Sequence, residues 1–389
     1  MTAVVANAAS VAAALVGLIA ACGLFVVVAG AVAVWRFAKR PPRRARTSPA
    51  VTILKPLCGD EPLLEAALAS ICAQAYPAFQ VVFGVCDLDD PALPTVARIR
   101  QRFPERDIAV VVDPALHGPN RKIGNLVNML PAACLDVLVF SDSDLHVAPD
   151  YIDRIVAALD QPGIGLVTTL CMGLPTSPGR AGRLGASGIS HLFLPGALLA
   201  RALGREDCLG TTMALRRDTL ARVGGLASLV RHLADDNVLA QRVRHLGLGV
   251  GLADTVPMTA VPERSLRALW EHELRWARTI RALEPTLYAA STVQYPLFWA
   301  VAAVGLSGAS AWSVGLFAAA WVVRAAAACW TDAMLRQRGR RLAAAIWLLP
   351  LRDVMSASQV AASYLGARVV WRGHVMHADD GRVAALERG

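Results

Sequence analysis

An uncharged apolar run near the N-terminus limits what this chain can fold into more than any other feature. From Ser10 to Trp35 the sequence has 26 residues without a charged side chain. About 20 apolar residues in a helix cross the hydrocarbon core of a bilayer, and no small-residue cleavage signal obviously ends the run. Residues 36–46 then carry Arg and Lys but no acid. We therefore predict a transmembrane anchor with a basic juxtamembrane segment over residues 1–46, and the positive-inside rule puts the following chain in the cytoplasm.

The composition extends this expectation to the rest of the chain. Of the 389 residues, 55% are hydrophobic and 18% are charged, which is too apolar for a purely soluble protein and too long for one domain. Lys and Arg exceed Asp and Glu by 39 to 30. Because these basic residues flank apolar runs, they favour an anionic membrane surface over nucleic acid as a partner. The eight cysteines form no CxxC pair, which predicts reduced, buried thiols in a cytoplasmic domain.

Apolar segments return near the C-terminus. Residues 293–311 and 313–330 are expected to be two spans, the second interrupted by Arg324, and residues 342–370 are a third apolar region carrying Arg352 and Asp353. Charges inside a membrane are costly, so they indicate function or pairing. Alternatively, Arg324 reaches the interface while Arg352 and Asp353 pair with each other in an interfacial or re-entrant helix. We predict a C-terminal membrane region over residues 291–389 with two or three spans.

Between these apolar regions, strand and helix patterns alternate, which is typical of a parallel α/β sheet. The expected domain covers residues 47–290. Its strands are predicted at 51–54, 81–85, 108–112, 137–141 and 165–169, and its clearest helices at 63–74, 238–246 and 266–283. Residues 184–203 are apolar but broken by Gly and Pro, so we expect an interfacial stretch there instead of a span.

The strand expected at 137–141 runs directly into Asp142, Ser143 and Asp144. Side chains at i and i+2 of an extended segment point to the same side, so both carboxylates can bind one Mg²⁺ or Mn²⁺. Ligands of open α/β sheets bind beyond the carboxyl ends of the strands. The alternative is an ordinary strand-to-helix loop in which an Asp caps the helix.

Three more polar positions fall at strand ends or helix starts. Asp87 follows the strand at 81–85, where an acid can accept hydrogen bonds from a base or ribose. Lys122 begins a predicted helix, whose N-terminus favours phosphate, whereas Arg121 is expected to be solvated. Asp236 opens the helix at 238–246, although a helix-capping Asp is common.

A basic and aromatic group lies in the helix at 266–283. His272, Arg275 and Trp276 are spaced i, i+3 and i+4, so they share one face of that helix. Trp and Arg close to a membrane are also common interface anchors, which is the structural alternative.

Together, the acids Asp87, Asp142 with Asp144, and Asp236, followed by Arg275-Trp276, resemble the D, D, D, (Q/R)xxRW pattern of the membrane-bound inverting glycosyltransferases of families 2 and 21. His272 stands where those families usually have Gln or Arg, and the resemblance places it with Asp236, Arg275 and Trp276 among the catalytic residues. Within them the chain resembles the ceramide glucosyltransferases and, more fully, the hopanoid-biosynthesis-associated glycosyltransferases. The segments that carry this likeness are 52–57, 120–122, 141–144, 233–236 and 272–281.

The resemblance implies a GT-A fold, a Rossmann-like α/β domain for nucleotide-diphosphosugars, combined with transmembrane helices. It also implies a UDP-sugar donor and a divalent cation, Mg²⁺ or Mn²⁺. The implied roles are a metal site at Asp142 and Asp144, uridine contacts at Lys55, Pro56 and Asp87, phosphate contacts at Lys122, a general base at Asp236, a leaving-diphosphate contact at Arg275, and an acceptor wall at Trp276.

The implied acceptor is a membrane lipid reached from the cytoplasmic side of a bacterial inner membrane. Resemblance favours N-acetylglucosamine transfer to a hopanoid such as bacteriohopanetetrol, and glucose transfer to ceramide, a sphingolipid, is the alternative. A processive polysaccharide synthase is disfavoured because three or so C-terminal spans are a thin basis for a channel. A non-catalytic membrane scaffold is the reading from another functional class, and intact acids at every motif position argue against it. The sequence leaves open the sugar, the lipid, the number of spans, the side of the tail, the oligomeric state and the choice between Mg²⁺ and Mn²⁺.

Overall fold

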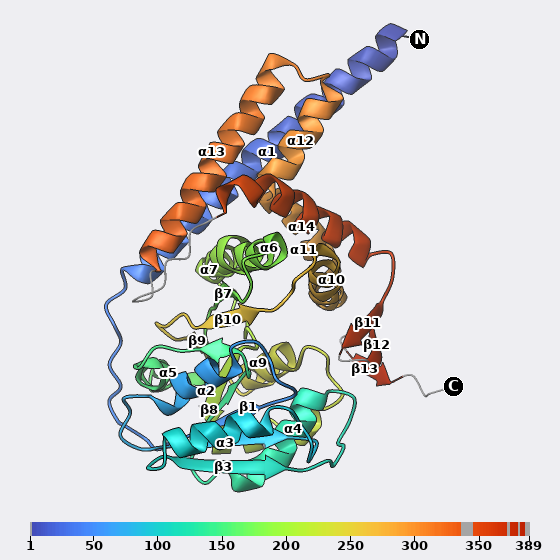
Figure 1. Cartoon of the computed structure of the whole chain (residues 1–389). Helices are drawn as coiled ribbons and strands as arrows, with labels where there is room; N and C mark the ends of the chain where they lie inside the picture. Colours follow the sequence, from blue (N-terminus) through green and yellow to red (C-terminus); the bar gives the residue numbers. More distant parts are fainter. Residues whose placement is uncertain (1, 336–344, 372–373, 380–381, 386–389) are drawn as a thin grey trace. The chain divides into compact units, whose positions relative to one another are not determined.

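The computed structural model describes residues 2–335, 345–371, 374–379 and 382–385 (Figure 1). The chain divides into two compact units, which we call the helical unit and the sheet unit. The helical unit comprises residues 1–39, 177–203 and 263–367, and the sheet unit comprises residues 40–176, 204–262 and 368–389. This division differs from the predicted single domain over 47–290, because two segments of that range group with the apolar helices.

The sheet unit contains a seven-stranded sheet and a smaller three-stranded sheet. The large sheet has the order β3 (Asp107–Val112), β2 (Phe79–Val85), β1 (Val51–Pro56), β4 (Val137–Ser141), β8 (Thr212–Arg216), β6 (Ile164–Thr168), β9 (Gly249–Leu252). The small sheet has the order β5 (Leu145–His146), β10 (Met258–Val261), β7 (Met172–Pro175). A further sheet is formed by β11 (Arg368–Trp371), β12 (His374–Asp379) and β13 (Arg382–Ala385).

The large sheet is mixed, so the prediction of a parallel sheet is wrong at strand β8. Strands β3, β2, β1 and β4 are parallel to one another and β6 is parallel to β9, but β8 runs antiparallel to both β4 and β6. The side-chain pattern of a strand shows its burial and not its direction. Parallel pairing was inferred from alternation with helices, and that alternation breaks down between β6 and β8.

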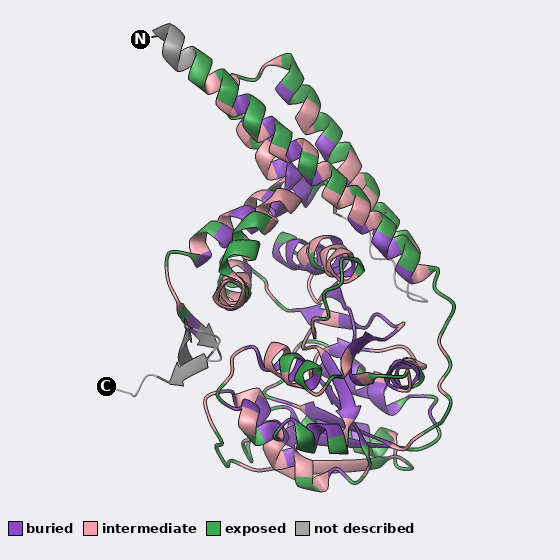
Figure 2. Cartoon of the chain, turned by 180° about the vertical axis from the view of Figure 1, so that it is seen from behind, coloured by how far each residue is buried: buried purple, intermediate pink, exposed green. Residues whose placement is uncertain are grey.

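Helices cover both faces of the large sheet, and this explains its unbroken apolar strands. Neighbouring residues of one strand belong to different cores: Ile53 and Val81 lie in one hydrophobic cluster, while Leu54 and Val82 lie in the other. A strand buried on both faces needs apolar residues at every position, and strands β2 and β4 are buried along their whole length, whereas the edge strand β3 is only partly buried (Figure 2). The helices of this unit are α2 (Leu64–Cys72), α3 (Leu93–Arg102), α4 (Arg121–Met129), α5 (Tyr151–Leu159), α8 (Arg217–Arg222), α9 (Asp235–His245), and the 3₁₀ turns η1 (Leu130–Ala132) and η3 (Leu226–Leu229).

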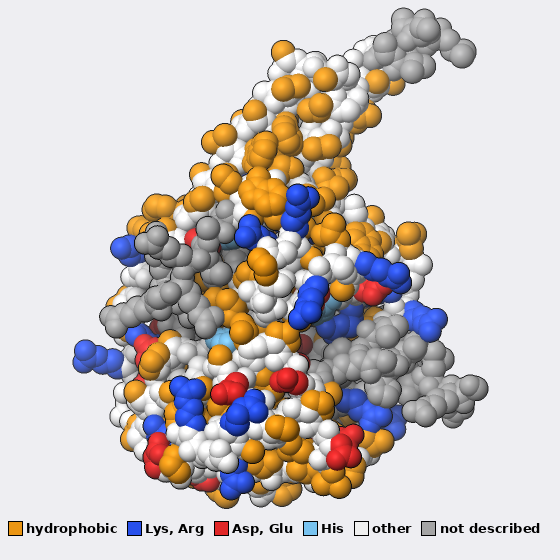
Figure 3. Space-filling view, viewed as in Figure 1, with side chains coloured by type: hydrophobic (Ala, Val, Ile, Leu, Met, Phe, Trp, Pro, Cys, Tyr) orange, Lys and Arg blue, Asp and Glu red, His pale blue; other side chains and the backbone are white. Residues whose placement is uncertain are grey.

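The helical unit contains helices long and apolar enough to cross a membrane. Two described helices qualify by length and composition, α1 over Asn7–Ala38 and α13 over Ala311–Met334. Figure 3 shows the visible surface of their bundle covered mainly by hydrophobic side chains. The elements of this unit are α1 (Thr2–Ala38), α6 (Arg180–Gly188), the π-helical turn η2 (Ile189–Phe193), α7 (Leu194–Ala202), α10 (Leu266–Leu283), α11 (Pro285–Ala290), η4 (Ser291–Gln294), α12 (Pro296–Leu306), α13 (Ala311–Met334), η5 (Ile346–Leu348) and α14 (Leu349–Ser363).

The C-terminal spans differ in part from those expected. The expected span at 293–311 contains α12, which has 11 residues and qualifies only together with Pro285–Gln294, across a bend of 72°. The third apolar region contains α14, whose 15 residues are about 22 Å long and too short to span a bilayer. Residues 342–344 of that region lie outside the described residues. The expected interfacial stretch at 184–203 is a helical run through α6, η2 and α7.

Buried charges in the helical unit are paired, but not in the expected way. Arg352 and Asp353 do not pair with each other, because neighbouring residues of a helix point about 100° apart. Asp353 instead accepts a hydrogen bond from Arg324 Nη2 at 2.8 Å, and Arg352 binds Glu273 of α10 at 2.7 Å. Arg324 is only 1% exposed, so it does not reach the interface.

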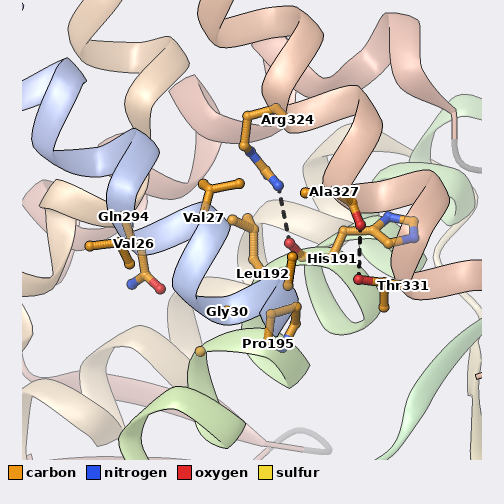
Figure 4. Close-up of a pocket in the computed structure, with 12 residues that line it drawn as sticks. Val26, Val27, Gly30, His191, Leu192, Pro195, Gln294, Arg324, Ala327 and Thr331 are labelled. Carbon is orange, nitrogen blue, oxygen red and sulfur yellow. Dashed lines mark hydrogen bonds between the residues drawn. The ribbon is translucent and has the colours of Figure 1, made fainter. Parts of the chain in front are cut away.

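Arg324 also repairs a break in a neighbouring helix (Figure 4). Pro195 has no N–H to donate to the carbonyl of His191, four residues earlier in the helical run. Arg324 Nη1 donates to that carbonyl at 3.1 Å. One arginine therefore satisfies both a buried carboxylate and an orphaned backbone oxygen.

The cysteines are all free thiols. Cys72, Cys171 and Cys208 are buried as expected, but Cys22, Cys58, Cys134 and Cys329 are exposed, so the expectation of general burial is wrong. Cys22 and Cys329 lie on α1 and α13, whose composition suits an apolar surrounding.

Candidate functional site

Four carboxylates gather at the carboxyl end of β4 in the sheet unit, and we call them the acidic group: Asp142, Asp144, Asp235 and Asp236. Strand β4 ends at Ser141, so Asp142 and Asp144 follow at once, and Asp235 and Asp236 open helix α9. The charge of Asp142 acts on the other three carboxylates, which shows that the two segments are close. Acids far apart in the sequence thus meet at the strand end, as the motif predicts.

Lys122 of α4 is the cation at the centre of this group. Its Nζ lies 2.6 Å from Asp142 Oδ1 and donates to the carbonyl of Gly210 at 3.2 Å. Burial would lower the pKa of this ammonium, but the charges of Asp142 and Asp235 outweigh that effect and raise it. Lys122 therefore carries its charge throughout the physiological pH range.

Asn120 places Lys122 relative to the acids. Its Oδ1 accepts a hydrogen bond from the N–H of Ile123 at 3.1 Å, so it caps helix α4. Its Nδ2 donates to Asp235 Oδ1 at 2.9 Å and to the carbonyl of His232 at 2.9 Å. One side chain thus joins the starts of α4 and α9.

Asp144 lies in a surrounding that disfavours its charge. Burial raises its pKa to about 6, with the negative charge of Asp142 as the second cause. A hydrogen bond from Thr259 Oγ1 at 2.5 Å, donated from β10, opposes the shift without cancelling it. The ionised form of Asp144 is therefore costly, mainly because the carboxylate is buried.

Asp236 is half-buried, and its surroundings also favour the protonated acid. Burial and the charge of Asp235 both raise its pKa. Gly210 makes room for it: a Cβ on Gly210 would come within 2.7 Å of Asp236 Oδ2, and Gly210 has φ +71°, which favours glycine. A carboxylate with a raised pKa is a stronger base than an ordinary aspartate.

Lys55 and Pro56 end strand β1 beneath this group. Lys55 is fully buried, and its Nζ donates to the carbonyl of Asp142 and lies 3.4 Å from Ser141 Oγ. Burial lowers its pKa to about 8, although the nearby acids oppose the shift. In this position Lys55 holds the turn that carries Asp142, and the uridine contact stays a prediction.

Asp87 shares the carboxyl edge of the sheet but not the contacts of the acidic group. It follows β2, whose neighbour β1 also pairs with β4. Its exposed carboxylate accepts a hydrogen bond from the N–H of Asp89 at 3.0 Å. Among the described residues, no ion pair joins it to Lys122.

His272, Arg275 and Trp276 lie on α10 in the helical unit. Ser265 caps this helix by accepting a hydrogen bond from the N–H of Ala268 at 3.1 Å. His272 Nδ1 bonds to Glu263, and the His272 and Trp276 rings are 4.4 Å apart, as an i, i+4 pair allows. Trp276 is 41% exposed.

The donor atoms at Asp142 and Asp144 suit a hard cation that takes its remaining ligands from a phosphate. Among the described residues, no group of three or more His, Cys, Asp and Glu side chains has metal-binding geometry. Mg²⁺ is commonly held by one or two carboxylates together with substrate phosphates. Burial and the charge of Asp142 both disfavour the ionised form of Asp144, and a bound cation would favour it. The residues present therefore fit such an ion.

Four contributors to this site receive no individual role from the sequence alone. Asn120 and Asp235 lie in the segments 120–122 and 233–236 that carry the family resemblance, and Asn before a helix is also a preferred cap. Gly210 and Thr259 carry no local signal, because their roles depend on chain segments that meet only in the fold.

The comparison with protein families gives a match over nearly the whole chain. The model of Glycosyl transferase family 21 matches residues 15–384. The chain is 27% identical over 301 residues to a ceramide glucosyltransferase of Komagataella phaffii, covering 62% of this chain and 59% of that protein. It is 23% identical over 254 residues to ceramide glucosyltransferase 1 of Caenorhabditis elegans, covering 64% and 53%. The chain therefore spans less than two thirds of the length of these relatives.

A solved structure supports the fold. The chain is similar to the mannosyltransferase PcManGT from Pyrobaculum calidifontis, with a TM-score of 0.50, 21% identity, and coverage of 90% of this chain and 98% of that one. This likeness shows the fold alone, and it confirms the expected GT-A-like α/β domain. With the match over residues 15–384, the chain belongs to glycosyl transferase family 21.

Proposed function

We propose that this protein transfers a sugar from a UDP-sugar to the hydroxyl group of a membrane lipid, with inversion at the anomeric carbon. The observation that carries the proposal is the acidic group at the carboxyl end of β4, in which Asp142, Asp235 and Asp236 act electrostatically on Lys122 while the charge of Lys55 acts on Asp144. The names of the relatives support a glucosyl group and a ceramide acceptor. The similar mannosyltransferase is described in complex with GDP-mannose and Mn²⁺, which supports a nucleotide-sugar and a divalent cation.

The donor diphosphate would bind at Asp142, Asp144 and Lys122. A divalent cation held by the two carboxylates would neutralise charge on the departing UDP. The ammonium of Lys122 lies beside Asp142, where the diphosphate would bind. It would donate hydrogen bonds to the phosphate oxygens in place of part of its hydrogen bonding to Asp142. Lys55 would act indirectly by holding the carbonyl of Asp142. Asp87 and Pro56 remain proposed contacts for the uridine.

Asp236 would be the general base. Its carboxylate takes the proton of the acceptor hydroxyl while that oxygen bonds to the anomeric carbon and the bond from carbon to the diphosphate oxygen breaks. One displacement from the face opposite the leaving group inverts the configuration. A positioned base of this kind supplies about 10²- to 10⁴-fold in rate.

Arg275 and Trp276 receive their roles from the family motif. The Arg275 guanidinium would bind the leaving diphosphate through two hydrogen bonds. The exposed ring of Trp276 would form an apolar wall for the acceptor. His272, which bonds to Glu263 and packs on Trp276, would hold that ring.

The acceptor has two candidates. The motif segments resemble those of hopanoid-associated enzymes, which favours N-acetylglucosamine transfer to a hopanoid polyol. The named relatives favour glucose transfer to ceramide with comparable weight. We propose a location in the bacterial inner membrane with the sheet unit in the cytoplasm, from the basic residues that follow α1.

The decisive experiment incubates membranes containing the protein with UDP-glucose or UDP-N-acetylglucosamine and with bacteriohopanetetrol or ceramide. Mass spectrometry of the lipids then identifies the sugar and the acceptor together. We expect Asp236→Asn to lower transfer by about 10²- to 10⁴-fold while UDP still binds. Asp218→Asn, which changes an acid in the first turn of α8, is the matched control and should retain activity. Transfer by Asp236→Asn at the normal rate would eliminate Asp236 as the base, and no product with any pair would favour the scaffold alternative.

A further inference from the structure

Helix α14 carries two adjacent buried charges that bind different partners. Asp353 binds Arg324 of α13, and it also accepts the N–H of Leu297 at the start of α12 at 3.2 Å. Arg352 points to α10 instead. The helix therefore connects the spanning bundle on one side with the motif helix α10 on the other, all within the helical unit.

All three nitrogens of the Arg352 guanidinium donate hydrogen bonds. Its guanidinium binds both oxygens of Glu273, with Nη1 2.8 Å from Oε1 and Nη2 2.7 Å from Oε2. Its Nε donates to Ser356 Oγ at 3.1 Å, and Nη1 also donates to the carbonyl of Leu184 of α6 at 3.3 Å. Gln359 Nε2 completes the group by donating to Glu273 Oε2 at 2.8 Å. Arg352 is 1% exposed, so little water competes with these bonds.

Glu273 lies inside the motif itself, between His272 and Arg275. A bidentate bond fixes both the distance and the rotation of the helix that carries its carboxylate. Only Leu269 and Ala277 of α10 are buried, so apolar packing alone fixes this helix weakly. The Glu273 bond therefore sets where the next turn of α10 presents Arg275 and Trp276.

We propose that Arg352 is a positioning residue for the transfer reaction, acting through Glu273 on the orientation of Arg275 and Trp276. This inference rests on the proposed function, in which Arg275 contacts the leaving diphosphate. Charge on that diphosphate grows during the reaction, so a misplaced Arg275 reduces stabilisation of the transition state more than binding of the donor. The expected signature is a loss in kcat with little change in the donor KM.

The test variant is Arg352→Lys, which keeps the charge but cannot form the two-pronged bond. We expect kcat per folded protein to fall about 10- to 100-fold, the range that a displacement of about 1 Å produces, with the donor KM changed less than about threefold. The matched control is Arg324→Lys, the same change in the other buried pair on α14. It should keep kcat within about twofold. Unchanged kcat in Arg352→Lys, or an equal loss in Arg324→Lys, would overturn the proposal.

A second variant separates positioning from stability. Glu273→Gln with Arg352→Met removes both buried charges together, which often leaves stability intact. We expect this double variant to fold with normal thermal stability and still show the kcat loss. Recovery of kcat together with stability would mean that the pair only stabilises the unit. Absence of transfer by the unmodified protein with every donor would instead refute the proposed function.

Discussion

The two units of this protein treat buried charge in opposite ways. In the helical unit each buried arginine has one carboxylate partner, Asp353 for Arg324 and Glu273 for Arg352. In the sheet unit the acidic group brings four carboxylates together with two lysines: Lys122, which forms an ion pair with Asp142, and Lys55, whose charge acts on Asp144. In the two arginine pairs the charges neutralise each other, so the pairs can hold helices together without a ligand. An excess of like charges is costly to bury, so protonation of one of the acids, or a cation bound beside them, would stabilise this group.

The first prediction removes one charge of the Asp353–Arg324 pair in the helical unit. Asp353→Asn leaves the Arg324 guanidinium charged and buried without its carboxylate, which costs about 3–5 kcal/mol. The new amide can still accept the N–H of Leu297, so the loss reports mainly the charge. Thermal unfolding of the purified protein in detergent, with donor kinetics on the folded fraction, measures it.

The control for this variant is Glu271→Gln, which removes an exposed pair with Arg267 whose side chain is 89% exposed. It should shift stability by less than about 0.5 kcal/mol. Adding Arg324→Met to Asp353→Asn should recover part of the lost stability, because neither charge of this pair then remains buried. Equal melting of Asp353→Asn and the unmodified protein would show that the pair is not stabilising.

The second prediction removes Lys122, the lysine that is ion-paired within the acidic group. Lys122→Met leaves Asp142 without its 2.6 Å partner and removes a charged contact to the donor phosphates. A hydrogen bond to a charged group contributes about 1.5–3 kcal/mol, so the donor KM should rise about 10- to 100-fold. Initial rates at varied UDP-sugar concentration measure this change.

Arg98→Met is the matched control, since it deletes a cation from an exposed pair with Glu65 in the same unit. Its donor KM should stay within about twofold of the original value. A normal donor KM in Lys122→Met would mean that the lysine only neutralises Asp142.

Sequence patterns predicted local features of the fold well and spatial ones less well. The helix at 266–283 has the expected bounds, because Ser265 and a clear apolar stripe mark it. The five predicted strands all exist: four are largely buried, where burial on both faces requires continuous apolar runs, and β3 is also apolar although it is only partly buried. The direction of β8 was not predictable, because strand direction leaves no trace in side-chain periodicity. The pairing of Arg324 with Asp353 also depended on helices meeting across 29 residues of chain.

The candidate site shows the same limit. Asp142, Asp144 and Asp236 were found because they follow a strand or open a helix, and the fold does bring them together. Lys55 was assigned to uridine from the motif, but its full burial was not visible in the sequence. Gly210 and Thr259 depend on contacts between distant segments, which no local pattern encodes.

The last prediction concerns the pH dependence of kcat. The pKa of Asp236 is raised by burial and by Asp235, so the carboxylate takes up a proton at a higher pH than an ordinary aspartate. Below that pKa the base is lost, and kcat should fall about tenfold per pH unit, starting well above the pH near 4 expected for an exposed aspartate. The raised pKa also means that the folded state binds this proton more tightly than the unfolded state, so stability does not fall with this protonation.

Asp235→Asn separates this effect from general acid sensitivity. It removes the neighbouring negative charge while an amide oxygen can still accept the hydrogen bond from Asn120, so the acidic limb of the kcat profile should move to lower pH. Glu271→Gln should leave the limb in place, because its pair with Arg267 is exposed and has no part in the acidic group. The measurement is UDP release at saturating donor across the pH range, with the folded fraction checked at each point. A profile that stays flat down to pH near 4 would show that the reaction does not depend on an unprotonated Asp236, and that the excess charge serves cation binding alone.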